Sequence, residues 1–467
     1  MVTPVRRGLA AFVMLAALAM IFVGHAMLTL TASAALVAYL SLSWRQFTLG
    51  TWVPVILSIA ALALALQRGI SASVLLQAVE RALFLAALIA MLGTLRSAAS
   101  IAPEVARAGL FLTSRPASQR YVALASGGHL FGVLINFGGL ALLLDLAMRS
   151  MNSPATQDLP PDIRKARLRR MSLAIIRGFG LISLWSPFGF ATNAILITLP
   201  GMSYFQFGPI GFAMSFVFLA LGWLFDRLQG RGYRRLGLPP PAPPPGAWIG
   251  ALALLGHIFA LGTGVVVLHE VTTLSFQQAL ILVVPAYSIG WAAASGSRSG
   301  SGVLLALREA GGATWDRLSA MGPEIGVFAS AGFLPVVLLA LVPLEPLRMG
   351  IGSLGMGAVP LALSLAISIV ALAFVGINPI VTASVLGAIA AQLAVPGLSQ
   401  TAIALAITGG WTAVIGMSPF ITTIIITASI TRRSVWQVGP VWNGAYSGAV
   451  LIIWCALLAG LMWSGLI

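Results

Sequence analysis

The sequence predicts an all-α, polytopic membrane protein, and three features lead to this fold class. Of its 467 residues, 59% are hydrophobic and only 8% are charged, whereas soluble domains carry charge on about a quarter of their residues. Apolar runs, many of them about 20 residues or longer, alternate with short polar segments along the whole chain. The net charge of +15 collects in short arginine clusters between the runs, as the positive-inside rule predicts for cytoplasmic loops.

The apolar runs predict about 12 to 14 membrane elements, some spanning and some re-entrant. The first run follows Arg6-Arg7. We interpret it as a span and not as a secretory signal, because many hydrophobic segments follow it. The expected location is the inner (cytoplasmic) membrane, with the N-terminus in the cytoplasm. The single cysteine, Cys455, supports neither a disulfide nor a metal cluster.

Two apolar runs are interrupted by Ser-Pro, at Trp185-Ser186-Pro187-Phe188-Gly189 and at Met417-Ser418-Pro419-Phe420-Ile421. Each run extends over about 30 residues, more than the roughly 20 that a helix needs to cross a bilayer. Proline removes a backbone donor and disfavours the helical conformation of the preceding residue, so each run is predicted to form two half-helices. In lipid such a break is tolerated only where it is buried in protein or lines a wet cavity. A matched pair of breaks therefore indicates a binding site.

The loop charges predict that the two broken runs have opposite orientations. The first starts after the cluster Arg164 to Arg170 and ends at uncharged Leu199-Pro200-Gly201. The second starts after uncharged Pro396-Gly397 and ends at Arg432-Arg433. Because arginine clusters mark the cytoplasmic side, the chain is predicted to contain two inverted-topology repeats.

Other residues extend the comparison of the two repeats. Gly178 precedes the first break as Gly410 precedes the second, and the run from Gly128 resembles the run from Ile377. Glu80 to Arg96 predicts a re-entrant hairpin, with Glu324 to Pro335 as its counterpart. In this arrangement Arg115 and Arg120 lie outside, against the charge rule.

These features divide the chain into five segments. They are N-terminal scaffold helices (1–74), repeat 1 with a hairpin and a broken helix (75–225), a cytoplasmic proline-rich linker (226–247), further scaffold helices (248–322), and repeat 2, again with a hairpin and a broken helix (323–467).

The segment from Ser186 to Asn193 is similar to the helix break of the ion-transporter superfamily. That superfamily includes divalent-anion symporters, the large membrane subunit of tripartite (TRAP) dicarboxylate transporters and citrate-metal symporters, and the resemblance extends over residues 75–465. It implies a scaffold that holds a mobile unit of hairpins and broken helices, in a homodimer that works by an elevator motion. The superfamily also includes one class of sodium/proton antiporter, which resembles Ser-Pro followed by an acidic residue, where this chain has Gly189-Phe190 and Ile421-Thr422.

The chemistry of the breaks favours an anionic or neutral solute. A half-helix that follows Ser-Pro offers free N–H groups and a positive dipole end, and the preceding half-helix offers carbonyl groups that can coordinate a cation. The nearby side chains carry hydroxyl and amide groups and no carboxylate. The alternative is that Ser-Pro only kinks a packed helix. The predicted substrate-binding residues are Ser186, Pro187, Thr192, Asn193, Ser418, Pro419, Thr422, Thr423 and Asn378.

Three further residues are candidates for ion or proton coupling. His129 and Asn136 lie on one helix face, and His129 is either a proton relay or a packing residue bonded to a carbonyl. Arg177 either pairs with an anionic substrate or extends to the cytoplasmic face. No cofactor is expected beyond the coupling ion, H⁺ or Na⁺. A metal site is not expected either, because His269-Glu270 lacks the second histidine of a zinc-protease motif.

The sequence thus predicts a secondary active transporter of an organic acid or oxyanion, coupled to a proton or sodium gradient. The expected partners are the small anionic solute, membrane lipid and a second copy of the chain. One alternative is a cation/proton antiporter, which needs Asp145, Glu80 or Glu324 to face the cavity. Another is the membrane subunit of a permease that depends on a soluble binding protein. A membrane-embedded enzyme or lipid-handling protein is not expected, because the sequence shows no cluster of catalytic His, Asp or Glu residues, no nucleotide-binding loop and no catalytic triad spacing. The charge pattern indicates topology, not nucleic-acid binding.

Overall fold

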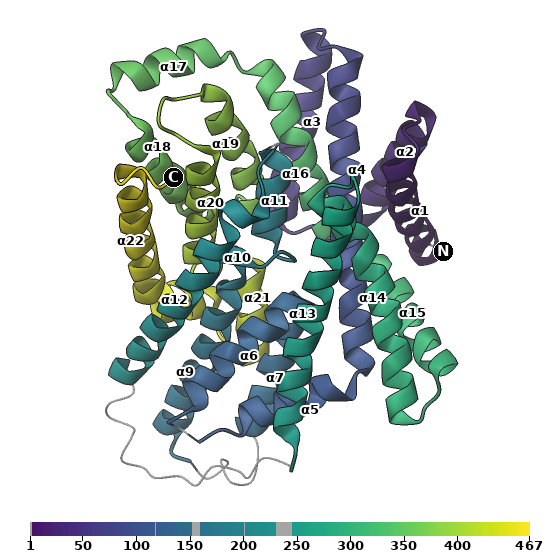
Figure 1. Cartoon of the computed structure of the whole chain (residues 1–467), viewed down its shortest axis with the longest axis vertical. Helices are drawn as coiled ribbons and strands as arrows, with labels where there is room; N and C mark the ends of the chain where they lie inside the picture. Colours follow the sequence, from purple (N-terminus) through teal and green to yellow (C-terminus); the bar gives the residue numbers. More distant parts are fainter. Residues whose placement is uncertain (1, 117, 152–158, 200, 230–244) are drawn as a thin grey trace.

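The computed structural model describes residues 2–116, 118–151, 159–199, 201–229 and 245–467. Every regular element in these residues is a helix (Figure 1), and ten of the helices described are long and apolar enough to cross a membrane. The predicted fold class, an all-α multi-pass membrane protein, is confirmed. Most of the predicted proline-rich linker (230–244) lies outside the described residues.

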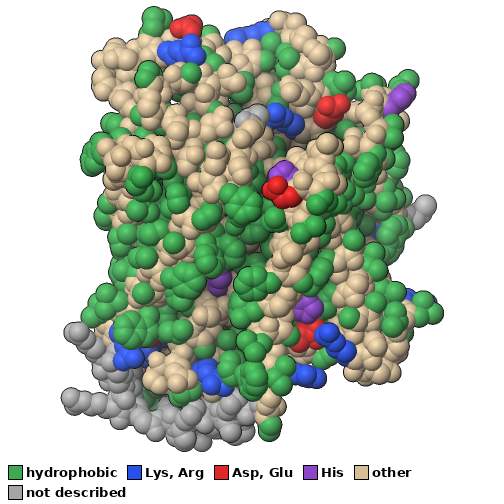
Figure 2. Space-filling view, in the orientation of Figure 1, with side chains coloured by type: hydrophobic (Ala, Val, Ile, Leu, Met, Phe, Trp, Pro, Cys, Tyr) green, Lys and Arg blue, Asp and Glu red, His purple; other side chains and the backbone are tan. Residues whose placement is uncertain are grey.

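The surface matches this class. Figure 2 shows hydrophobic side chains over most of the middle of one face, while most of the arginine and lysine side chains lie near its upper and lower ends. This distribution is the one expected of a protein whose middle contacts lipid and whose two ends contact water and headgroups.

In the described residues, three α-helices precede the repeats, and three more separate them. The first group is α1 (Val2–Phe22), α2 (Ala26–Ser43) and α3 (Leu49–Gln67). The second group is α13 (Ala247–Val271), α14 (Phe276–Ser299) and α15 (Val303–Leu318). Helix α3 packs against the first helix of the second repeat, and α14 against the first helix of the first repeat.

The first repeat runs from a long helix through a short amphipathic helix and a two-helix hairpin to a broken helix and a final span. Its helices are α4 (Ala72–Ile101), α5 (Pro103–Thr113), α6 (Arg120–Ile135), α7 (Phe137–Met151), α9 (Pro161–Gly180), α10 (Ile182–Trp185), α11 (Phe190–Thr198) and α12 (Gly208–Gln229).

The second repeat follows the same order. Its helices are α16 (Gly322–Leu341), α17 (Leu344–Ser353), α18 (Ala358–Phe374), α19 (Pro379–Leu393), α20 (Gln400–Ile415), α21 (Thr422–Thr431) and α22 (Trp442–Trp463). In Figure 1, α5 and the α6–α7 hairpin lie toward the lower end of the molecule, whereas α17 and the α18–α19 hairpin lie toward the upper end. The two repeats therefore run in opposite directions.

The hairpins do not lie where the sequence predicted them. Helices α4 and α16 run unbroken through Glu80–Arg96 and Glu324–Pro335. The chain turns instead at Asn136, where φ is 53°, and at Gly376, where φ is 91°. Positive φ values end a right-handed helix. Within these helices, Glu80 and Arg81 line one cavity and Glu324 lines another.

The positions of the hairpins also determine which residues of the two repeats correspond. Gly128 lies inside α6, whereas Asn378 caps the start of α19, so the structural counterpart of Asn378 is the hairpin residue Asn136. Helices α6 and α7 enter and leave at one end of the molecule. Arg120, at the start of α6, therefore lies near Arg167, which belongs to the arginine cluster from Arg164 to Arg170. The predicted violation of the charge rule at Arg120 was a consequence of the misplaced hairpin.

The broken helix of each repeat packs tightly against the first hairpin helix at a glycine. A Cβ atom at Gly178 of α9 would collide with the carbonyl oxygen of Ala125 in α6. A Cβ atom at Gly410 of α20 would collide with the carbonyl oxygen of Ala366 in α18. Small residues at such crossings let helix backbones approach closely in membranes. The two glycines thus hold equivalent helix pairs together in the two repeats.

Candidate functional site

The first predicted break is present between α10, which ends at Trp185, and α11, which begins at Phe190. The Nδ2 atom of Asn193 donates to the carbonyl oxygens of Pro187 (3.1 Å) and Gly189 (2.9 Å) and so holds the non-helical segment in place. Gly189, the residue before α11, provides no side-chain cap. The first N–H groups of α11 are therefore left for another acceptor.

The second predicted break is present between α20, which ends at Ile415, and α21, which begins at Thr422. The Ser418 hydroxyl donates to the carbonyl oxygen of Ala373 (2.7 Å), near the end of α18. The segment is thereby fixed to the second hairpin. Ile421, which precedes α21, provides no side-chain cap either.

Each hairpin carries an asparagine at its tip, and both asparagines use their oxygen in the same way. The Oδ1 atom of Asn136 accepts from the N–H of Phe137 (2.8 Å), and the Oδ1 atom of Asn378 accepts from the N–H of Ile380 (3.1 Å). Neither Nδ2 group has a hydrogen-bond partner in the described part of the chain. Two amide N–H₂ groups thus remain available as donors.

Both tips and both breaks meet at one central cavity of about 250 Å³. Its wall joins residues far apart in the sequence, from α3 through to α21. The lining residues are Thr48, Gly50, Thr51, Asn136, Phe137, Phe179, Ile182, Ser183, Phe190, Pro323, Glu324, Val327, Phe328, Asn378, Pro379, Ile380, Trp411, Ile415, Phe420, Ile421, Thr422 and Ile425.

Helix N-termini dominate the electrostatics of this cavity. Six of the helices in the described residues, α3, α7, α11, α16, α19 and α21, have residues of their first turn in its wall. Each N-terminus is equivalent to about half a positive charge. Helices α11 and α21, which have no side-chain cap, also offer N–H groups without intrahelical partners, whereas the first N–H groups of α19 bond to Asn378. The ends of α6 and α20 also reach the wall and offer carbonyl oxygens.

Aromatic rings form much of the remaining wall. The ring of Phe137 lies 5.6 Å from the rings of Phe179 and of Phe190, and the ring of Phe190 lies 4.8 Å from that of Phe328. Trp411 and Phe420 also line the cavity. The site therefore combines a few polar donors with a broad apolar surface, as small-molecule sites commonly do.

The structure brings only part of the predicted substrate-binding set to this cavity. Asn378, Thr422 and the coupling candidate Asn136 line it, as does Ser183. The remaining predicted residues are absent from its wall: Ser186, Pro187, Thr192, Asn193, Ser418, Pro419 and Thr423. The hydroxyls of Ser186, Thr192 and Thr423 are buried without a partner in the described residues. These three side chains are buried inside the protein and do not reach the cavity.

His129 packs between helices and does not line the cavity. Its Nδ1 atom lies 3.2 Å from the carbonyl oxygen of Gly178, and its Nε2 atom accepts from the indole N–H of Trp185 at 3.1 Å. These two partners require a neutral ring with the proton on Nδ1. The contacts are those of the packing interpretation, in which His129 is bonded to a carbonyl.

Arg177 of α9 is buried, and its side chain contacts α12 and α22. Its Nε donates to Oδ1 of Asn443 (2.8 Å), and its Nη1 donates to the carbonyl oxygen of Gly222 (3.3 Å). The guanidinium also lies over the ring of Tyr446, 4.6 Å from the centroid. The Nδ2 group of Asn443 in turn donates to the carbonyl of Gly416 (3.0 Å), at the end of α20. Arg177 therefore neither lines the cavity nor extends to the surface, and it connects the two broken helices.

Of the three carboxylates considered for an antiporter, only Glu324 lines the central cavity. Asp145 pairs with Arg149 at 2.8 Å, and Glu80 accepts from Thr29 at 3.4 Å beside a different cavity. Sequence reasoning missed Thr48 and Thr51, because α3 lies outside the repeats. Their Thr-x-x-Thr spacing before an apolar run is too common to have identified them.

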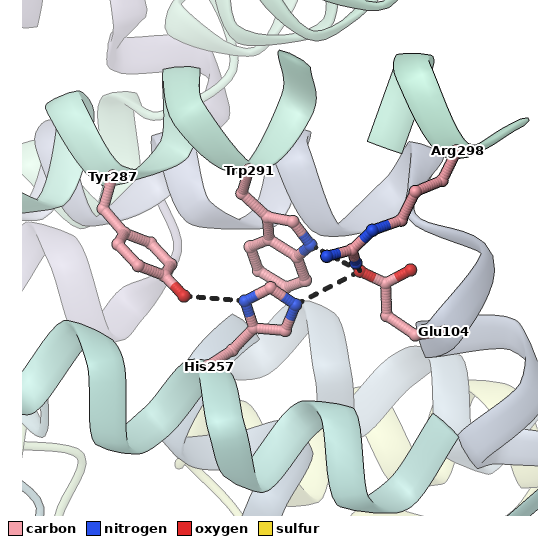
Figure 3. Close-up of polar contacts among 5 residues, drawn as sticks. All are labelled: Glu104, His257, Tyr287, Trp291 and Arg298. Carbon is pink, nitrogen blue, oxygen red and sulfur yellow. Dashed lines mark hydrogen bonds and ion pairs between the residues drawn. The ribbon is translucent and has the colours of Figure 1, made fainter. Parts of the chain in front are cut away.

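A separate polar cluster joins α5 to α13 and α14 (Figure 3). The Oε1 atom of Glu104 accepts from the Trp291 indole N–H (2.8 Å) and lies 3.1 Å from Nε2 of His257. Nδ1 of His257 lies 2.7 Å from the Tyr287 hydroxyl, and Arg298 approaches Glu104 to 3.9 Å. This cluster fixes the short helix α5, which leads into the first hairpin.

Comparison with solved structures shows a related fold. The crystal structure of the YdaH transporter from Alcanivorax borkumensis, reported to have an unusual topology, matches with a TM-score of 0.54 and 17% sequence identity. The match covers 82% of this chain and 86% of that chain. No family model and no curated protein matches the sequence. The chain thus has the fold of a polytopic membrane transporter.

Proposed function

We propose that this protein is a secondary active transporter of a small anionic solute, coupled to a proton or sodium gradient. The observation that carries the proposal is the convergence of six helix N-termini and two asparagine tips on one cavity between the two repeats. Such groups stabilise negative charge. Broken helices that meet at the centre of inverted repeats form the binding sites of many secondary transporters. The likeness in fold to a transporter supports the same class.

The cavity favours an organic acid over an inorganic oxyanion. Its wall includes the rings of Phe137, Phe179, Phe190 and Phe328, which offer no hydrogen bonds. A carboxylate at the helix N-termini would leave the rest of an organic acid against these rings, whereas a sulfate would leave them unused. Burial of the apolar part of the solute then adds to its affinity.

Alternating access would follow from movement of the two hairpins and broken helices relative to the remaining helices, in an elevator motion. The tight glycine contacts at Gly178 and Gly410 support this division, because they join each broken helix to its hairpin. Arg177 and Asn443 join the two broken helices through α22, and Arg177 also bonds α12, so α12 and α22 would belong to the same moving unit.

The proposal is tested by uptake into proteoliposomes. Radiolabelled succinate, citrate, benzoate and sulfate are offered with an imposed proton or sodium gradient. The variants are Asn136→Gly, which suits the positive φ of the tip, and Asn378→Ser, which keeps a capping oxygen for Ile380. Each removes an amide donor. Because a hydrogen bond to a charged group contributes about 1.5–3 kcal/mol, we expect solute affinity to fall roughly 10- to 100-fold.

Gln400→Ser serves as the matched control, since Gln400 is an exposed amide at the start of α20. It should leave uptake unchanged. Anion uptake that is indifferent to both asparagines would place the binding site elsewhere. Sodium or proton exchange without any anion flux would reject the anion proposal.

The second candidate function is cation/proton antiport, and the position of Glu324 favours it. A carboxylate in the central cavity meets the condition that an antiporter requires. The same proteoliposomes distinguish the two functions, because an antiporter exchanges sodium for protons in the absence of any anionic solute.

A further inference from the structure

Glu324 is the one ionisable side chain among the described residues that line the central cavity. It lies in the first turn of α16 and is exposed, so it can exchange protons with water. It forms no ion pair within the described part of the chain. Its neighbours in the cavity wall are apolar side chains, hydroxyls and amides.

The charged and titratable groups around Glu324 come from four of the elements packed near α16. Helix α4 contributes Arg96, α15 contributes Arg317, and α2 contributes the phenol of Tyr39. The short helix η1 (Trp44–Gln46), which packs against α16, carries Arg45, whose guanidinium lies over the ring of Trp44. Helices α3, α11 and α19 contain no ionisable residue. None of these cations lines the cavity.

The empty and the occupied cavity make different demands on this carboxylate. In the empty cavity, an ionised Glu324 balances the positive ends of the surrounding helices. When an anionic solute occupies the same 250 Å³, two negative charges share a small space and compete for the same dipoles. Like charges in one site disfavour double ionisation. Protonation of Glu324 removes this repulsion and lets its hydroxyl donate to the solute.

We infer that an anionic solute binds in this cavity together with one proton, which Glu324 holds. The inference rests on the proposed function and extends it, because it names the proton as the ion that accompanies the solute. By linkage, protonation of Glu324 and binding of the anion favour each other. The affinity for the solute should therefore rise as the pH falls, by up to about tenfold per pH unit for one linked proton.

The test measures solute affinity and proton uptake on binding. The probe is the radiolabelled member of the succinate, citrate, benzoate and sulfate panel that gives the largest uptake, over a pH range in which its own charge is constant. Wild-type protein should bind it more tightly at lower pH and take up about one proton per solute bound. Glu324→Gln resembles the protonated side chain, so it should bind the probe with an affinity that is independent of pH and without proton uptake.

Two further variants make the test decisive. Glu324→Asp keeps a carboxylate and should retain both the pH dependence and the proton uptake. Glu80→Gln, at a carboxylate outside this cavity, should behave as wild type. An unchanged pH dependence in Glu324→Gln overturns the inference and leaves the transporter proposal intact. If the wild-type protein moves no anion of the panel in either gradient, the proposed function fails and this inference fails with it.

Discussion

At the scale of single residues, Glu104 shows how one buried carboxylate can position a helix. It lies in the first turn of α5, outside the membrane-spanning helices, and accepts hydrogen bonds from α13 and α14 (Figure 3). The hydrogen bond with His257 is the largest influence and, with that from Trp291, lowers the pKa of Glu104 to about 2, although burial opposes this shift. The ionised form is therefore the one that the folded protein favours.

We predict that Glu104→Ala destabilises the protein at neutral pH by about 1–3 kcal/mol, because buried donors lose their acceptor. A lowered pKa stabilises the folded state above the ordinary value of 4.5 and loses this effect as the pH falls toward 2. The difference from wild type should therefore shrink as the pH falls below about 4.5. Thermal unfolding in detergent, followed by circular dichroism across pH, checks this expectation.

Glu345→Ala is the matched control for Glu104→Ala. Glu345 pairs with Arg348 at 2.8 Å, but its side chain is 73% exposed. Surface ion pairs contribute about 0–1 kcal/mol, so this variant should unfold close to the wild-type temperature. Equal destabilisation by both substitutions would mean that the cluster around Glu104 has no special role.

At the scale of elements, the helix pairs α6–α9 and α18–α20 depend on close backbone contact. Gly178 and Gly410 leave no room for a Cβ atom against the carbonyl oxygens of the facing helices. In the membrane, such contacts replace the hydrophobic effect as a source of helix association. The equivalence of the two glycines, proposed from the sequence, is thus matched by equivalent contacts in the structure.

Gly178→Ala and Gly410→Ala should each cost about 1–3 kcal/mol, the typical effect of overpacking. Both changes should also lower solute uptake, because they separate a hairpin tip from its break. Gly256→Ala is the control, since no atom lies within 4 Å of the position that a Cβ atom would take at Gly256 in α13. Alanine there should be neutral or stabilising by up to about 1 kcal/mol. Tolerance of alanine at Gly178 and Gly410 would show that the helix pairs can separate without consequence.

At the scale of the whole molecule, the inverted arrangement places equivalent elements at opposite ends. Figure 1 shows α17 at the upper end, and α21 extends toward the lower end, where α5 lies. Under the positive-inside rule, the arginine clusters predict that the lower end is cytoplasmic. The two hairpins then enter the membrane from opposite sides, and their tips meet at the central cavity.

Labelling of single cysteines tests this topology. In a Cys455→Ala background, Ser353→Cys lies on the exposed surface of α17 and Ser434→Cys follows α21. We expect an impermeant maleimide to label Ser353→Cys from outside intact cells, and Ser434→Cys only after the cells are opened. Labelling of both positions from the same side would contradict the orientation assigned to the second repeat.

The sequence by itself determined the fold class and the positions of the breaks. Long apolar runs predict helices in lipid because only a helix satisfies its own backbone there. Proline interrupts a helix through its own ring and missing N–H, so Ser186-Pro187 and Ser418-Pro419 could be assigned as breaks without knowledge of their neighbours. These properties are local, and local properties can be read along a chain.

Only the tertiary structure decided which residues form the cavity. The turn at Asn136 lies inside one apolar run and depends on contacts with other helices, so its hairpin was misplaced. Ser186 and Ser418 are buried behind the breaks, while Thr48, Thr51 and Glu324 line the cavity from helices outside the two breaks. The packing of distant segments determines which side of a helix faces a site. In a chain whose helices are apolar on nearly every face, the hydrophobic pattern does not show which side that is.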